Sequence, residues 1–249
     1  MYLSTLMVET GDNPDRPRPG RLWLRNLYHV HQRLCMAFPS VGQKDGDAEF
    51  LKPFDPAGFT HVHGARTAEQ AFLFRVEPHA DGNPTILVQS ALKPDWDYAF
   101  QNARFLLAAD PELKVYDPTF AKDQSLRFRL VANPTRKIDT KSGPDGRRSN
   151  GSRVPVKYDL LPSWLSRQGE RGGFSLADEA CTYLPGYVFW RKPTRDEEKE
   201  VKGARLFSVR FDGPLRVTDA DTFRETLVRG IGPAKAFGFG LLSVAPARP

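Results

Sequence analysis

Apolar residues in the first half of the chain recur at two spacings, one typical of strands and one typical of helices. Leu24, Leu27, Val30, Leu34 and Phe38 follow the helical spacing. Short apolar runs bounded by Gly, Pro, Asn and Asp predict strands. The predicted elements are, in order, a strand at Tyr2–Glu9, a helix at Leu22–Phe38, strands at Ala71–Val76 and Thr85–Ser90, a helix at Trp96–Leu107 and a strand at Leu113–Tyr116.

The second half has a similar patterning. Leu126–Ala132 alternates apolar residues with arginine, as a half-exposed strand does. A basic, turn-rich insertion at Arg136–Arg153 has Pro144-Asp145-Gly146 at its centre and is compatible with a hairpin. The remaining predicted elements are a helix at Leu160–Gln168, strands at Tyr187–Arg191 and Leu206–Phe211, a helix at Thr218–Arg229 and a strand at Leu241–Ala245.

The order of elements predicts the fold class. Strand–helix–strand–strand–helix–strand is the order of the ferredoxin-like (βαββαβ, RRM-like) fold. We therefore expect an α+β chain of two tandem ferredoxin-like domains, residues 1–118 and 119–249. No internal sequence repeat is visible, so this duplication rests on element order rather than on self-similarity.

The densest local signal is the glycine-rich string that runs from Gly230 to Leu242. It holds four glycines within eleven residues, Gly230, Gly232, Gly238 and Gly240, together with Lys235. A phosphate-binding P-loop and a dinucleotide fingerprint both need a strand before and a helix after the glycines, and here the predicted order is the reverse. A tight helix-to-strand connection without a ligand and a loop whose main chain has a functional role both remain open.

Composition and charge narrow the class of protein. The 249 residues are 40% hydrophobic, enough for a sizeable core, and no apolar run approaches the ~20 residues that span a bilayer. We expect a cytoplasmic protein without a membrane partner. Its two cysteines, Cys35 and Cys181, are too few for a disulfide framework and are expected to be buried thiols.

The formal net charge of +6 is concentrated in one segment. Lys122–Asp159 holds ten basic and four acidic residues, which accounts for the whole excess. A concentrated basic block indicates a polyanion partner more strongly than an evenly spread excess does. A merely solvated loop is the alternative.

Several blocks of the sequence form a distinctive set. They are the terminal string Gly-Ile-Gly-Pro-Ala-Lys-Ala-Phe-Gly-Phe-Gly-Leu-Leu, the opening Met-Tyr-Leu-Ser, Leu27-Tyr-His-Val-His-Gln32, Leu130-Val-Ala-Asn-Pro134, Arg153-Val-Pro155, Trp164-Leu-Ser-Arg-Gln-Gly169 and Gly173-Phe174. Together these blocks resemble one protein family, the CasE endoribonucleases of type I-E CRISPR systems. The resemblance covers nearly the whole chain, and the segments at 11–20 and 40–68 depart from it.

The resemblance implies a catalytic site on the first helix, at His31 and Tyr28. These residues are three positions apart, so a helix carries them on one side. The implied reaction is metal-independent: a ribose 2′-hydroxyl attacks the adjacent phosphate and leaves a 2′,3′-cyclic phosphate and a 5′-hydroxyl. No cofactor and no metal are expected. A satisfied core histidine is the alternative for His31, and the pair His61 and His63 is an alternative metal site.

The resemblance also implies the partners. These are the stem-loop of CRISPR repeat RNA, the mature CRISPR RNA that the enzyme keeps, and other subunits of the type I-E complex Cascade. The residues expected to bind RNA are Arg136, Lys137, Lys141, Arg147, Arg148 and Arg153 in the basic insertion and Gly232, Lys235, Gly238 and Gly240 in the glycine-rich string. Two other functions stay open, a non-catalytic RNA-binding scaffold and a metal-dependent enzyme of ferredoxin-like fold.

Overall fold

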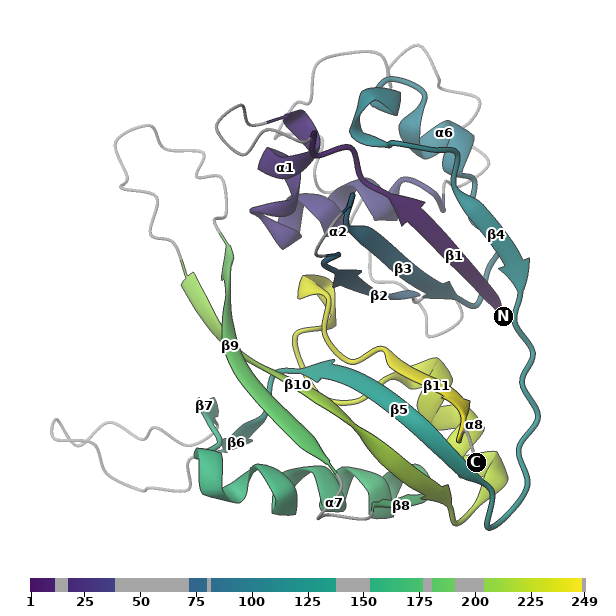
Figure 1. Ribbon diagram of the computed structural model, residues 1–249, viewed down its shortest axis with the longest axis vertical. Helices are drawn as coiled ribbons and strands as arrows, with labels where there is room; N and C mark the ends of the chain where they lie inside the picture. The colour runs from purple at the N-terminus through teal and green to yellow at the C-terminus, as the bar shows by residue number, and fades with distance from the viewer. Residues whose placement is uncertain are drawn as a thin grey trace, which may run out of the picture. The chain divides into compact units, whose positions relative to one another are not determined.

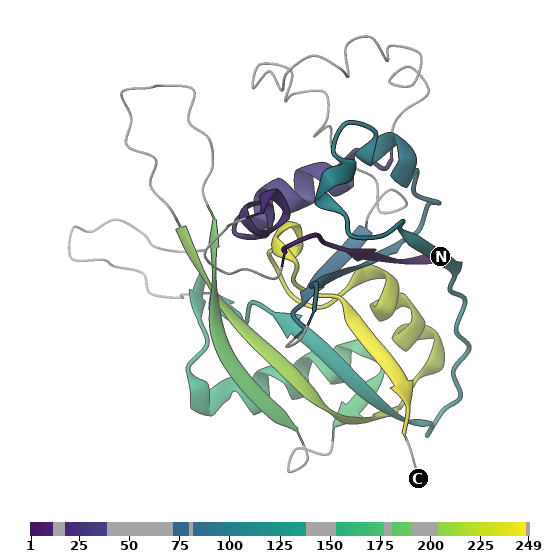
Figure 2. The same ribbon diagram turned by 45° about the horizontal axis from the view of Figure 1, so that its top comes forward.

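The computed structural model describes residues 1–11, 18–38, 72–79, 82–137, 153–176, 181–190 and 204–247 (Figures 1 and 2). The chain forms two compact units. Unit 1 comprises Met1–Asp117, Phe189–Arg205 and Ala236–Gly238, and unit 2 comprises Pro118–Val188, Leu206–Lys235 and Phe239–Pro249. Two short segments of the second half thus belong to unit 1, so the two units are not simply the two halves of the chain. The domain boundary predicted between residues 118 and 119 stays a prediction.

Unit 1 is an antiparallel sheet with helices. Its strands lie in the order β2-β3-β1-β4, which is the ferredoxin-like order. The elements are β1 (Tyr2–Met7), α1 (Pro19–Leu24), α2 (Leu27–Cys35), β2 (Phe72–Glu77), β3 (Thr85–Ser90), α6 (Trp96–Phe100), the 3₁₀ turn η3 (Arg104–Leu106) and β4 (Glu112–Val115).

The core of unit 1 lies between this sheet and helices α2 and α6. Val30 and Leu34 of α2 and Phe100 of α6 are fully buried against Phe74 and Ile86 of the sheet. The two α2 positions are ones that the helical spacing of the sequence assigned to an apolar face, so burial of that face holds α2 on the sheet.

The predicted single helix at Leu22–Phe38 is wrong in one respect, because the chain forms two helices there. Asn26 has an extended backbone (φ −125°), and its side-chain oxygen accepts a hydrogen bond of 3.2 Å from the Tyr28 N–H. Asparagine is a preferred N-cap, since its side chain satisfies an amide that the first helical turn leaves open. Asn26 is therefore the N-cap of α2, and Leu27 is the first residue of the helix.

Unit 2 repeats the topology of unit 1. Its sheet has the order β11-β5-β10-β8, so its first, second, third and fourth strands are β5, β8, β10 and β11, and β9 adds to β10. The elements are β5 (Ser125–Ala132), β6 (Thr135–Lys137), β7 (Arg153–Pro155), the 3₁₀ turn η4 (Tyr158–Leu160), α7 (Leu161–Gly172), β8 (Phe174–Leu176), β9 (Thr182–Trp190), β10 (Ala204–Val217), α8 (Ala220–Arg229), the 3₁₀ turn η6 (Lys235–Phe237) and β11 (Leu242–Pro246).

The chain is therefore an α+β protein of two tandem ferredoxin-like domains, as predicted. Helices α7 and α8 cover one face of the unit 2 sheet (Figure 1). Strand β8 was not predicted, because its three residues are too short to show a period. The cap of α8 is Asp219, whose carboxylate accepts a 2.7 Å hydrogen bond from the Thr222 N–H.

Candidate active site

Helix α2 carries the two residues predicted to be catalytic. Tyr28 and His31 lie three positions apart on it, and both are half-buried. His29, between them in sequence, is exposed, and the desolvation that it does experience lowers the pKa of its imidazole. The helical period thus separates His29 from the face that Tyr28 and His31 share.

The imidazole of His31 is held by aromatic rings and a thiol. Its ring is stacked on Phe72 and Phe74 of β2, with centroids 5.3 Å and 6.3 Å away and interplanar angles of 29° and 18°. Its Nε2 atom lies 3.6 Å from Sγ of Cys35, and its Nδ1 atom is buried. This environment fixes the plane of the imidazole, and an imidazole can both take up and release a proton near neutral pH.

Tyr28 lies beside two other aromatic rings. Its ring centroid is 6.0 Å from that of Trp190, the last residue of β9, and 6.2 Å from that of Phe237 in η6. Burial raises the pKa of the Tyr28 phenol, and the nearby Cys35 raises it further. The phenol is therefore protonated at neutral pH and can donate a hydrogen bond.

The last two glycines of the terminal string are needed by the protein's own packing. Gly240 has φ +91°, and a Cβ placed there would lie 2.8 Å from the Ile231 carbonyl oxygen. The Gly240 N–H donates to the Val131 carbonyl at 2.8 Å, so that amide is already satisfied within the protein. A Cβ at Gly238 (φ +78°) would lie 3.3 Å from the Phe74 ring.

Gly232 and Lys235 occupy more open positions in the same string. A Cβ at Gly232 would meet only the Trp164 ring, at 3.6 Å, which is an ordinary contact. Lys235 is half-buried, and burial, followed by the neighbouring charge of Arg229, lowers the pKa of its ammonium group. Two neighbouring cations form a local site for an anion, which would relieve their mutual repulsion.

The basic insertion begins and ends in a two-stranded sheet. Strands β6 and β7 pair antiparallel, and Lys137 lies directly opposite Arg153. Arg136, Lys137 and Arg153 are all exposed. Like charges that face each other across strands repel, and a bound anion relieves that repulsion. Lys141, Arg147 and Arg148, predicted to bind RNA, lie outside the described residues.

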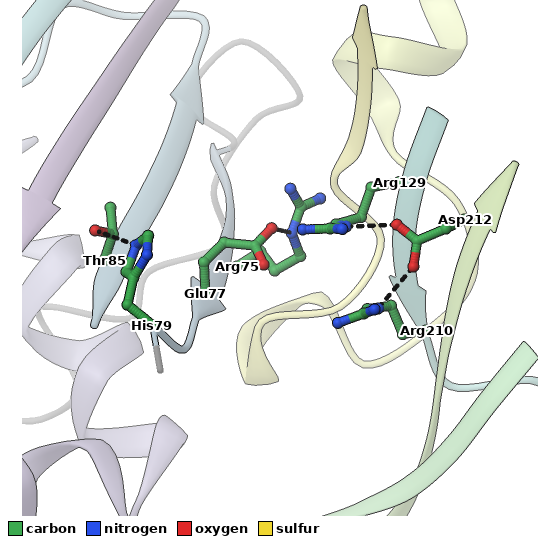
Figure 3. A network of polar contacts seen from close by, with 7 residues as sticks. All are labelled: Arg75, Glu77, His79, Thr85, Arg129, Arg210 and Asp212. Atoms are coloured by element: carbon green, nitrogen blue, oxygen red, sulfur yellow. Dashed lines mark hydrogen bonds and ion pairs between the residues drawn. The ribbon is translucent and has the colours of Figure 1, made fainter. Parts of the chain in front are cut away.

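Arginines on the unit 2 sheet were not singled out from the sequence. Asp212 of β10 accepts from Nε of Arg129 at 2.5 Å and from Nε of Arg210 at 2.6 Å (Figure 3). In unit 1, Nε of Arg75 donates to Glu77 at 2.6 Å. These arginines are engaged in ion pairs within their own sheets, and we do not assign them to the candidate site.

Three residues beside the candidate catalytic pair were also missed. Trp190 and Phe237 reach Tyr28 from distant segments, and no periodicity in the sequence signals that proximity. Cys35 was detectable, because it stands four residues after His31 on a predicted helix. Within the described residues, no group of three or more His, Cys, Asp or Glu side chains is arranged to hold a metal ion, and His61 and His63 lie outside them.

Among the helices that the structure describes, none has the length and hydropathy needed to cross a membrane.

Comparisons with known proteins agree along the whole chain. CRISPR-associated endoribonuclease Cse3 of Thermus thermophilus is 34% identical over 251 residues, which cover 99% of this chain and 100% of that protein. Cascade subunit CasE of Escherichia coli is 27% identical over 249 residues, with 99% and 100% covered. A structure of CRISPR endoribonuclease Cse3 bound to 19 nt RNA matches with a TM-score of 0.70 and 29% identity, over 99% of this chain and 100% of that one. Residues 1–246 match the family described as CRISPR associated protein, and the chain belongs to that family.

Proposed function

We propose that this protein is a metal-independent endoribonuclease that binds the stem-loop of CRISPR repeat RNA and cleaves precursor CRISPR RNA. The observation that carries the proposal is helix α2, which holds a histidine and a protonated tyrosine on one face in a chain that belongs to the family. The names of the full-length relatives, an endoribonuclease and a Cascade subunit, support it.

In the proposed reaction the ribose 2′-oxygen forms a bond to the adjacent phosphorus as the bond from phosphorus to the 5′-oxygen breaks. A base takes the proton from the 2′-hydroxyl, and an acid delivers a proton to the departing 5′-oxygen. His31 performs one of these two transfers, since imidazole serves either role near neutral pH. Tyr28, protonated because burial raises its pKa, donates a hydrogen bond to a phosphate oxygen or orients the 2′-hydroxyl.

The RNA is bound by two basic elements. One is the β6–β7 hairpin with its intervening insertion, through Arg136, Lys137, Lys141, Arg147, Arg148 and Arg153. Its opposed Lys137 and Arg153 suit the phosphates that flank a narrow groove of an A-form stem. The other is the glycine-rich string, in which Gly232 and Lys235 approach phosphate and Gly238 and Gly240 set the backbone path.

After cleavage the enzyme retains its product, the mature CRISPR RNA, and assembles with other type I-E Cascade subunits in the cytoplasm, where its proposed substrate is transcribed. The name of the Escherichia coli relative supports the assembly. A second function, a scaffold that binds repeat RNA without cutting it, is favoured by one observation. The contacts of His31 with Phe72, Phe74 and Cys35 are those of a core histidine.

The deciding experiment incubates purified protein with the CRISPR repeat RNAs of its own genome, with and without excess chelator. We expect one cut, a 2′,3′-cyclic phosphate and a 5′-hydroxyl, at a rate that chelator leaves unchanged. The matched control is the same RNA with a 2′-deoxy substitution at the nucleotide before the cut, which should bind and stay intact. Tight binding without cleavage of the unmodified RNA would establish the scaffold instead.

A further inference from the structure

Two aromatic rings from distant segments of the chain lie beside Tyr28. Trp190 ends β9, Phe237 ends η6, and both residues belong to unit 1 together with α2. The Trp190 and Phe237 centroids are 5.1 Å apart, and each lies within 6.2 Å of the Tyr28 centroid. We call Tyr28, Trp190 and Phe237 the aromatic cluster. All three residues are half-buried, so each keeps part of its surface open to a ligand.

The cluster contains a buried polar atom for which the described part of the chain supplies no hydrogen-bond partner. Nε1 of Trp190 is buried and has no hydrogen-bond partner among the residues that the structure describes. A buried donor in that state costs free energy, and indole N–H groups that are buried normally find an acceptor. A phenylalanine would supply an aromatic ring at this position without that cost. The tryptophan therefore indicates an acceptor that is supplied by a bound molecule.

An unpaired nucleobase satisfies both features of the cluster. Each base has an aromatic face that stacks on aromatic side chains and an edge of ring nitrogens and carbonyl oxygens that accept hydrogen bonds. A base inside a duplex offers neither its faces nor its pairing edge. Because Tyr28 belongs to the proposed catalytic pair, the base concerned is next to the phosphate that is cut.

We propose that the aromatic cluster binds the unpaired base of a nucleotide that flanks the scissile phosphate, and that the Trp190 indole turns on binding so that its Nε1–H, buried in the free protein, donates to the edge of that base. This inference rests on the proposed function, since it takes its position along the RNA from Tyr28. A base that is bound next to the reacting phosphate fixes the position of the ribose that carries the 2′-hydroxyl. This orientation aids the in-line attack on the phosphorus. Trp190 is thus a positioning residue for the reaction and a determinant of where the RNA is cut.

The test is a double-mutant cycle between protein and RNA. Dissociation constants are measured with uncleavable 2′-deoxy repeat RNA, either intact or abasic at one of the two nucleotides that flank the scissile phosphate. For the wild type, one abasic substitution should weaken binding about 5- to 150-fold, the range expected for one stacked base. With Trp190→Ala the same substitution should cost less than about twofold. Trp190→Phe, which keeps a ring and lacks the N–H, should fall between them.

Phe189→Ala is the matched control, because Phe189 precedes Trp190 on the same strand and is 64% exposed. Neighbouring side chains of a strand point to opposite faces, so Phe189→Ala should keep the full abasic penalty. Equal abasic penalties in the wild type, Trp190→Phe and Trp190→Ala would overturn the inference. If the wild type cuts repeat RNA and the penalties are equal, only the base-binding role is wrong. If it neither cuts nor binds repeat RNA, the proposed function is wrong as well.

Discussion

Sγ of Cys35 lies 3.6 Å from Nε2 of His31, one helical turn earlier on α2. The same imidazole is stacked on Phe72 and Phe74, so the residue predicted to move a proton is also packed like a core side chain. The two descriptions are compatible. A hydrogen bond between a thiol and an imidazole is weak, and the aromatic rings restrict the imidazole plane without using its nitrogens. The contacts therefore orient His31 before RNA binds.

Tyr28→Phe should slow cleavage about 10- to 100-fold at saturating RNA, the loss expected when a hydrogen bond to a charged group is removed. Because burial raises the pKa of Tyr28, its phenol is protonated at both pH 6 and pH 8, and the loss should be the same at the two values. Single-turnover rates at both pH values check this. Tyr116→Phe, which also alters a tyrosine of raised pKa, is the control and should keep the wild-type rate.

Element order, more than any single pattern, made the fold predictable from the sequence. The apolar spacing located α2, α7 and α8, and the strand–helix order gave the fold class of both units, although the strand predicted second in unit 2 corresponds to β9 and the strand in that place of the sheet is β8. The point where one predicted helix divides into two and the shortest strand were harder to predict. Asn26 splits one expected helix because its side chain caps the second, and β8 is three residues long. Such features depend on local hydrogen bonds and on neighbouring strands, which periodicity does not register.

Gly240→Ala should destabilise unit 2 by about 1–3 kcal/mol, the usual cost of holding a non-glycine residue in a strained backbone region. Its φ is +91°, and the added Cβ would lie 2.8 Å from the Ile231 carbonyl oxygen. Urea denaturation measures the effect. Gly82→Ala is the matched control, because nothing lies within 4 Å of a Cβ placed there. Equal midpoints for the two variants would show that Gly240 does not require glycine.

The affinity for RNA distinguishes the two roles proposed for residues of the glycine-rich string, which are contact with RNA and setting the path of the backbone. Measured well below the unfolding transition, the folded fraction of Gly240→Ala should bind repeat RNA about as tightly as the wild type, because the Gly240 amide already donates to Val131. A stable Gly240→Ala that has lost RNA binding would instead put that glycine against the RNA.

Lys137→Ala and Arg153→Ala should each reduce the slope of log K against log salt by about 0.7–0.9, the value of one phosphate contact. Neither change should lower the melting temperature, since the two exposed cations face each other across β6 and β7 and repel. Filter binding of uncleavable repeat RNA from low to moderate salt gives the slopes. Lys114→Ala removes the same charge from exposed β4 and should leave the slope unchanged. A wild-type slope for both hairpin variants would show that β6 and β7 do not touch phosphate.

Much less of the candidate site than of the fold follows from pattern alone. The spacing of Tyr28 and His31 predicts a shared helix face, but their neighbours come from β2, β9 and η6. Contacts between segments so far apart in sequence depend on the tertiary structure, so no window of the sequence contains them. The roles of the glycines in the terminal string also depend on contacts with distant segments. Gly238 and Gly240 were predicted from their residue type to bind RNA. The structure adds that a Cβ at Gly240 would clash with the Ile231 carbonyl and that one at Gly238 would be in tight contact with the Phe74 ring.

His31→Ala should lower the single-turnover cleavage rate about 10²–10⁴-fold, the usual contribution of a proton-transfer group. The dissociation constant for repeat RNA should hardly change, because the lost interaction belongs to the transition state and not to the bound ground state. Excess chelator should not alter either result. Cleavage rates and binding of the 2′-deoxy RNA are measured on the same preparations.

If His31 has only a packing role, the cleavage rate should follow the stability of the protein. The variants His31→Phe and Cys35→Ala distinguish this packing role from the catalytic one. His31→Phe keeps a ring on Phe72 and Phe74, so it should restore the melting temperature lost by His31→Ala and leave the rate as low. Cys35→Ala removes only the contact to Nε2, and should keep the rate within about tenfold of the wild type, as one weak hydrogen bond permits. If His31→Phe recovered cleavage together with stability, the imidazole would have no part in the reaction, and His31 would be a packing residue of the α2–β2 interface.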